Sequence, residues 1–150
     1  ELDKQEALKK LIPEADIIEK MGDWEIHGKH AEYFIAKKSG SGIGYIVQSF
    51  GKGYSSYINV LIAVDNDMKI KKIAILAHAE TPGLGDEIEK DAFKNQFAGK
   101  DLEHVKLVKT ETQDYIQAIT GVTISSRAVT DDAVKNGLAH LTKTLNAKKE

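Results

Sequence analysis

Cysteine is absent from the 150 residues of this chain, which excludes disulfides, thiolate chemistry, iron–sulfur clusters and cysteine-ligated zinc. Aromatic residues make up only 7%, which disfavours a stacking platform for single-stranded nucleic acid. Neither sign of charge dominates, because the chain has 21 basic and 23 acidic residues. There is therefore no electrostatic reason for it to bind nucleic acid or an anionic membrane surface. Long hydrophobic runs are also missing, because the longest, Val60 to Val64 and Ile73 to Ala77, are too short to span a bilayer.

Apolar residues are nevertheless plentiful enough for one core. They make up 41% of the chain, and 150 residues is the size of one ordinary domain. No internal repeat, low-complexity stretch or linker divides the sequence. We therefore expect a single domain over residues 1–150.

Periodicity in the first half predicts one helix and several strands. Residues 2–12 are expected to form a short helix that Pro13 ends. A strand is predicted over 43–50, after a Gly/Ser turn, and alternating apolar residues predict strands over 57–64 and 70–78. A polar turn at 65–67 makes the last two an antiparallel hairpin.

A capped helix is expected to follow the hairpin. Asp86 resembles a helix N-cap, with Glu89 completing a capping box and Gly99 ending the helix. Its core-facing residues would be Ile88, Ala92 and Phe97.

The remaining elements complete the predicted fold class. A short strand is expected over 105–108, and a last helix is expected to begin near Ser125 or Ser126. Four apolar residues at helical spacing place one face of that helix in the core: Val134, Leu138, Leu141 and Leu145. We therefore predict an α+β fold, a mainly antiparallel β-sheet with flanking helices.

Two segments carry residues suited to ligand chemistry, and the first is Glu80-Thr81-Pro82-Gly83-Leu84-Gly85. Pro82 and Gly83 favour the two central positions of a type II turn. Gly85 has no side chain, so the backbone there could lie against a flat ligand, to which Leu84 offers an apolar contact and Thr81 a hydrogen bond. On these residues alone, a plain strand-to-helix turn without a ligand is the simpler interpretation.

The second segment is Thr120-Gly121-Val122-Thr123-Ile124-Ser125-Ser126-Arg127, just before the last helix. Gly121 permits a sharp backbone turn. The hydroxyls of Thr123, Ser125 and Ser126, the cation of Arg127 and the free amides of a first helical turn could bind an anion such as a phosphate. The alternative is a hydroxyl-rich helix N-cap with no ligand.

Together the two segments resemble those of one family. Residues 120–123 are similar to the [Ser/Thr]-Gly-Ala-Thr flavinylation motif of FMN-binding domains, with Val122 where alanine is commoner. Residues 80–85 are similar to the ETPGLG segment of the same family, and residues 51–54 to a family loop near the flavin. The resemblance is best to the G subunit of Rnf-type ion-translocating electron-transport complexes. The C subunit of the sodium-pumping NADH:quinone reductase ranks second.

This resemblance implies a cofactor and the residues that would hold it. A flavin transferase would join FMN to the hydroxyl of Thr123 as a phosphoester. The residues implied to surround the cofactor are Thr120, Gly121, Val122, Ser125 and Ser126 beside the attachment, and Glu80, Thr81, Leu84 and Gly85 at the ring. The chain would be an electron-transfer subunit, not an enzyme alone.

The resemblance also implies partners and a location. The partners would be the other subunits of a membrane-bound complex that couples electron transfer to ion translocation, and not nucleic acid. The sequence starts at Glu1 and shows no signal peptide. We therefore expect an N-terminal membrane anchor outside this sequence, with the domain on the extracytoplasmic side.

Alternatives to this interpretation remain at the level of the sequence. One is a sensory or regulatory FMN domain of the same fold, and another is a structural binding module that holds no flavin. Trp24 and Tyr54 could stack on a flavin ring or serve as ordinary core or rim residues. His78 and Glu80 share a strand face, but two ligands make no metal site, so no metal is expected.

Overall fold

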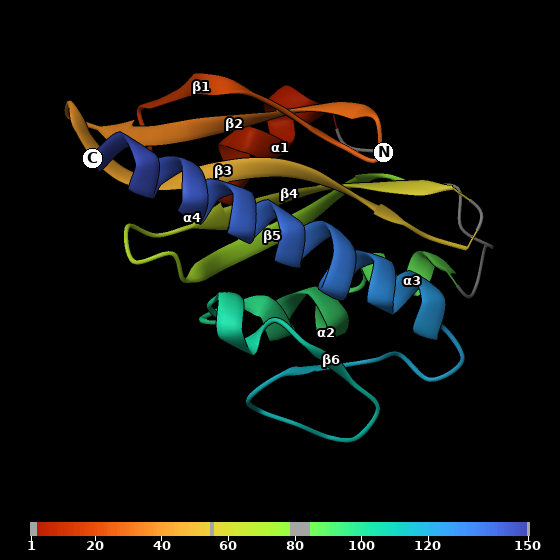
Figure 1. Ribbon diagram of the computed structural model, residues 1–150. Coiled ribbons are helices and arrows are strands. Elements are labelled where there is room, and N and C mark those ends of the chain that lie inside the picture. The colour runs from red at the N-terminus through yellow and green to blue at the C-terminus, as the bar shows by residue number, and fades with distance from the viewer. Residues whose placement is uncertain (1–2, 55, 79–84, 150) are drawn as a thin grey trace.

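A five-stranded antiparallel sheet forms the centre of the computed structural model, which describes residues 3–54, 56–78 and 85–149 (Figure 1). The strands lie side by side in their order along the chain: β1 (Ile17–Ile26), β2 (Lys29–Lys38), β3 (Ser41–Lys52), β4 (Tyr57–Val64) and β5 (Ile70–Ala77). Every strand therefore pairs with its neighbour in sequence. This confirms the predicted α+β class with a mainly antiparallel sheet.

Both faces of the sheet are covered, and two apolar clusters result. Helix α1 (Lys4–Leu11) packs on one face, where Leu61 and Ala63 of β4 point, and the C-terminal helix crosses the other (Figure 1). The residues of β4 that face the C-terminal helix are Ile58, Val60, Ile62 and Val64. Burial on both faces explains why β4 is a continuous apolar run instead of an alternating one.

The hairpin of β4 and β5 is present as predicted, whereas the hairpin of β1 and β2 was not predicted. The Asp65 carboxylate fixes the predicted turn, because it accepts hydrogen bonds from the backbone amides of Asp67 at 2.8 Å and Lys69 at 3.1 Å. Strand β1 is mostly exposed and contains a bulge between Lys20 and Gly22, so its apolar residues do not alternate cleanly.

The single capped helix predicted from Asp86 is wrong. The chain instead forms η1 (Gly85–Glu89), a one-turn helix α2 (Asp91–Lys94) that Lys90 precedes, and η2 (Asn95–Phe97). Ala92 is exposed and Phe93 takes the core position beside Ile88 and Phe97. Residues five apart in one α-helix differ by about 140° around its axis, so a break is needed for Ile88 and Phe93 to face the same core.

The segments that close the fold are short turns and a long helix. After η3 (Leu102–His104), strand β6 (Leu107–Val108) pairs in parallel with β7 (Ile116–Gln117), so the strand predicted over 105–108 is present but shorter. The last helix has three parts: α3 (Thr123–Arg127), a π-helical segment η4 (Ala128–Val134) and α4 (Lys135–Lys149). It begins at Thr123, earlier than predicted. No helix in the described ranges is long and apolar enough to cross a membrane.

Candidate functional site

The segment at 120–123 forms a tight turn that leads directly into α3. Gly121 has φ +78°, the left-handed conformation that its predicted turn requires, and the Val122 amide donates to the Ile119 carbonyl at 2.9 Å. Thr120 and Gly121 are exposed, while Val122 is buried and anchors the turn. The turn therefore presents Thr123 as the first residue of the helix.

The hydroxyl of Ser126 closes this turn onto the helix. It donates to the Val122 carbonyl at 2.7 Å and accepts from the Ile119 amide at 3.2 Å, and the side chain is fully buried. Its hydrogen-bonding capacity is thus used by the backbone. Ser125 is buried as well, so neither serine faces solvent.

Thr123 differs from the two serines. Its side chain is partly exposed and makes no hydrogen bond with any residue that the structure describes. The residue that occupies the N-cap position of α3 is Val122, which has no side-chain cap. The N-cap of α3 is therefore not a hydroxyl side chain, and Thr123 Oγ1 makes no hydrogen bond within the described part of the chain.

The residues that follow the first predicted segment contact the second segment. Glu80, Thr81 and Leu84 lie outside the described residues, but Gly85 begins η1, and η1 contacts α3. The element η1, which begins at the last residue of the 80–85 segment, therefore lies against α3. This proximity is what a ligand attached at one segment and contacting the other requires.

Gln96 fixes the approach to the turn. Its side-chain amide oxygen accepts from the Gln117 backbone amide at 2.8 Å, and its amide nitrogen donates to the Gln117 carbonyl at 3.2 Å. This pair of bonds ties η2 to β7. It holds the strand that leads to Gly121.

A groove of about 490 Å³ adjoins α3. The sequence did not predict that its lining residues would come together. Residues of the β1–β2 turn, the end of β3 and the C-terminal helix line it: His27, Lys52, Ile124, Arg127, Ala128, Asp131, Asp132 and Asn136. Ile124, the residue after Thr123, is half exposed at 51%. Lys52, Ile124 and Arg127 belong to segments singled out in the sequence, and tertiary contacts bring them together with the other lining residues.

The two carboxylates of this groove are held by backbone amides. Asp131 accepts from the Leu107 amide at 3.0 Å, and Asp132 accepts from the Lys52 amide at 2.9 Å and contacts His27 Nε2 at 2.8 Å. They join η4 to β6, to β3 and to the β1–β2 turn. Both lie past α3 in η4, so they do not occupy the first helical turn, where their charge would complement the helix dipole.

The two aromatic candidates have different environments. Trp24 stacks on His140, with ring centroids 4.3 Å apart and planes 9° apart, and its indole N–H donates to the Gln48 carbonyl at 2.9 Å. Burial and nearby Lys143 lower the pKa of His140. Trp24 is thus part of the packing beneath α4, whereas Tyr54 is 72% exposed.

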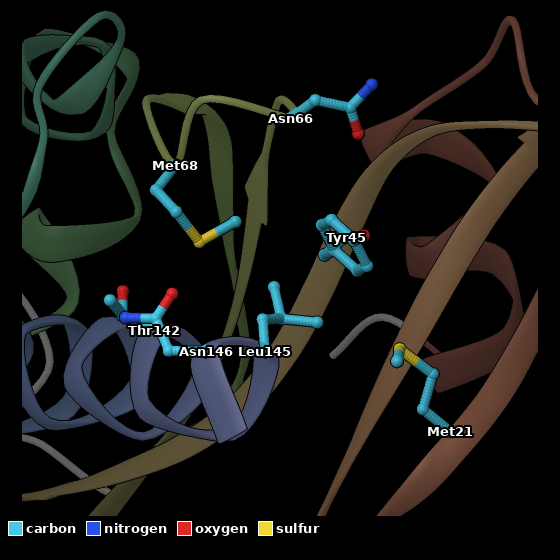
Figure 2. Close-up of a pocket in the computed structure, with 7 residues that line it drawn as sticks. All are labelled: Met21, Tyr45, Asn66, Met68, Thr142, Leu145 and Asn146. Atoms are coloured by element: carbon cyan, nitrogen blue, oxygen red, sulfur yellow. The ribbon is translucent and has the colours of Figure 1, made fainter. Parts of the chain in front are cut away.

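A second groove lies at the far end of the C-terminal helix. Its volume is about 280 Å³, and it is lined by Met21, Tyr45, Asn66, Met68, Thr142, Leu145 and Asn146 (Figure 2). Thr142 is about 28 Å along the helix from Thr123 at 1.5 Å per residue. Thr123 therefore lies at the opposite end of the C-terminal helix from this groove.

Comparison with known proteins places this chain in one family. The FMN-binding domain family matches residues 53–139. The G subunit of the proton-translocating ferredoxin:NAD(+) oxidoreductase complex of Clostridium ljungdahlii is 36% identical over 140 residues, which are 93% of this chain and 72% of that protein. The G subunit of the ion-translocating oxidoreductase complex of Methanosarcina acetivorans is 32% identical over 133 residues, 85% of this chain and 70% of that protein.

A solved structure supports the same placement. The crystal structure of the C subunit of the Na(+)-translocating NADH-quinone reductase from Parabacteroides distasonis superposes with a TM-score of 0.69 at 26% identity, over 95% of this chain and 83% of that chain. The chain therefore belongs to the FMN-binding domain family, together with these G subunits.

Proposed function

We propose that this domain is the FMN-carrying electron-transfer module of an ion-translocating oxidoreductase complex, with FMN joined as a phosphoester to Thr123. The main support for this proposal is the environment of Thr123, which stands at the start of a helix. Of the three hydroxyl residues in 123–126, it alone is partly exposed and makes no hydrogen bond within the described ranges. The free amides of the first turn favour a phosphate there. The similarity to G subunits over most of the chain supports the complex subunit over a regulatory domain.

The chain's own contribution is to attach and position the cofactor. Attachment replaces the O–H bond of Thr123 by an O–P bond, and the proton and the leaving group on the donor phosphorus depart. Ser126 and Gly121 hold the acceptor in place, as the turn geometry supports. FMN, when bound, supplies electron transfer through its ring.

We also propose the ring site, the partners and the location that the resemblance implies. The ring would contact residues 80–85, as the contact of η1 with α3 supports. A flavin transferase would load the protein, and the other subunits of the complex would exchange electrons with it. The domain would face the extracytoplasmic side, anchored by a segment outside this sequence.

The attachment is tested by expressing the domain with a flavin transferase. Thr123→Ala should abolish covalent flavin, measured as intact mass and as fluorescence of the denatured protein on a gel. Ser125→Ala is the matched control, because it removes a neighbouring hydroxyl and should retain the added mass. Covalent flavin in Thr123→Ala would refute the assignment.

A further inference from the structure

The groove beside α3 contains two cations from different elements, and neither is committed to a strong ion pair. Arg127 is 56% exposed, and its Nε lies 3.8 Å from Asp131 Oδ2, longer than a hydrogen bond. The other oxygen of that carboxylate is held by the Leu107 amide, so Asp131 does not depend on Arg127 for its position. Lys52 is exposed and makes no ion pair with any residue that the structure describes.

The backbone around these cations is fixed by short contacts. Strand β3 runs directly against η4 at Gly51, where an added Cβ would lie 1.9 Å from the Ala128 carbonyl oxygen. The next residue, Lys52, is held through its amide by Asp132, at 2.9 Å. Lys52 is thereby placed at the same groove as Arg127.

Helix geometry brings Arg127 close to Thr123. Residues four apart lie on one helix face with Cβ atoms about 5–6 Å apart. Side chains of a helix lean toward its N-terminus, so the guanidinium of Arg127 can extend over the turn that contains Thr123. Asp131 and Asp132 also face the groove, but backbone amides already hydrogen-bond both carboxylates.

We propose that Arg127 binds the phosphate of the threonine-linked flavin and acts as a positioning residue, with Lys52 supplying a second positive charge. This inference rests on the proposed attachment at Thr123. A phosphodiester is a permanent monoanion at neutral pH, and a guanidinium can donate two parallel hydrogen bonds to its oxygens. The contact would hold the phosphate against α3 and restrict the motion of the attached ring.

The test compares Arg127→Gln, Arg127→Lys and the control Lys135→Gln, which removes an exposed cation of the same helix that does not line the groove. In Arg127→Gln the ³¹P resonance of the attached flavin should move toward its position in denatured protein. The rate of covalent incorporation should fall about ten-fold, the loss typical of one charge-assisted hydrogen bond. Arg127→Lys should be intermediate, and Lys135→Gln should match the wild type.

The two proposals fail differently. If Arg127→Gln keeps the native ³¹P resonance and the incorporation rate of Lys135→Gln, the phosphate contact is refuted and the attachment at Thr123 stands. If the wild type takes up no covalent flavin, or Thr123→Ala still does, the proposed function falls and this inference falls with it. Circular dichroism of all variants checks the fold, which an exposed Arg127 should not control.

Discussion

Side-chain hydroxyl groups have very different environments in this molecule. Ser126 makes two hydrogen bonds, whereas Ser49 Oγ and Thr130 Oγ1 are fully buried and have no hydrogen-bond partner within the described ranges. Both unpartnered hydroxyls belong to elements that pack together, β3 and η4. A buried hydroxyl without a hydrogen-bond partner costs about 1–3 kcal/mol of folding free energy. Ser49 and Thr130 therefore each lower the stability of the core.

Replacing Thr130 by valine should therefore stabilise the protein. The two side chains have nearly the same shape, and valine removes only the unpartnered oxygen. We expect the free energy of unfolding in urea to rise by about 1 kcal/mol. Ser126→Ala is the opposite case, because it leaves the Ile119 amide without its partner, and it should lower stability by about 1–2 kcal/mol. A loss of stability in Thr130→Val would mean that the hydroxyl has a partner, such as an ordered water.

At the scale of elements, the π-helical segment η4 is the part that connects the site to the sheet. It follows α3 without a break, and its carboxylates reach β3, β6 and the β1–β2 turn. π-helical turns are rare in proteins as a whole, and those that occur are often found at functional sites. The close approach at Gly51 fixes η4 against β3, and with it the orientation of Thr123.

A methyl group at Gly51 should disturb this contact. Gly51→Ala would place Cβ 1.9 Å from the Ala128 carbonyl oxygen, so β3 and η4 must separate. We expect a loss of about 3 kcal/mol or more in the free energy of unfolding. Gly42→Ala in the same strand is the control, since its Cβ meets only the end of the Ile35 side chain at 3.2 Å and should change stability by less than about 1 kcal/mol. Equal stability of the two variants would contradict the role of this contact.

Some elements could be predicted from the sequence because local chemistry determines them. The β4–β5 hairpin has two apolar strand segments and an Asp65 turn between them. The first strand of the β1–β2 hairpin is bulged and exposed, so its sequence has no clear strand pattern. The turn of this hairpin is formed by His27 and Gly28, both with positive φ, and the sequence contains no strong signal for it. The helix predicted from Asp86 was wrong because the core needs Ile88 and Phe93 together, a tertiary demand that outweighs the capping pattern.

At the scale of the whole molecule, the motifs at 80–85 and 120–123 could be found from the sequence, but not their surroundings. The contact between η1 and α3 joins segments that are distant in the chain, and the groove depends on β3 and η4 meeting at Gly51. Local patterns contain no information about such pairings. The resemblance to a family supplied the proposed attachment residue. The folded structure was needed to find that the Thr123 hydroxyl has no hydrogen bond among the described residues and that two cations lie at the adjoining groove.

Helix α1 covers the face of the sheet opposite the C-terminal helix, and acid should weaken the packing of α1 on that face. Lys4 of α1 pairs with Glu32 of β2 and donates to Gln48 at 3.0 Å, and Lys20 contacts Glu32 at 2.9 Å. Hydrogen bonds from Lys4 and then Lys20 hold the pKa of Glu32 below its ordinary value of 4.5. Because the folded pKa is depressed, this contribution to stability is complete above pH 4.5 and is lost as the pH falls through the folded pKa.

Glu32→Gln should thus lower the free energy of unfolding at pH 6 by roughly 1 kcal/mol and make stability less dependent on pH between 6 and 3. Urea unfolding at both pH values measures this, with Glu25→Gln as the control, since Glu25 is an exposed carboxylate of β1 without an ion pair among the described residues. The wild type and Glu25→Gln should lose stability in parallel, and Glu32→Gln should lose less. If all three decline equally, the Lys4–Glu32 pair does not hold α1 on the sheet, and the apolar residues of α1, Ala7, Leu8 and Leu11, account for its docking alone.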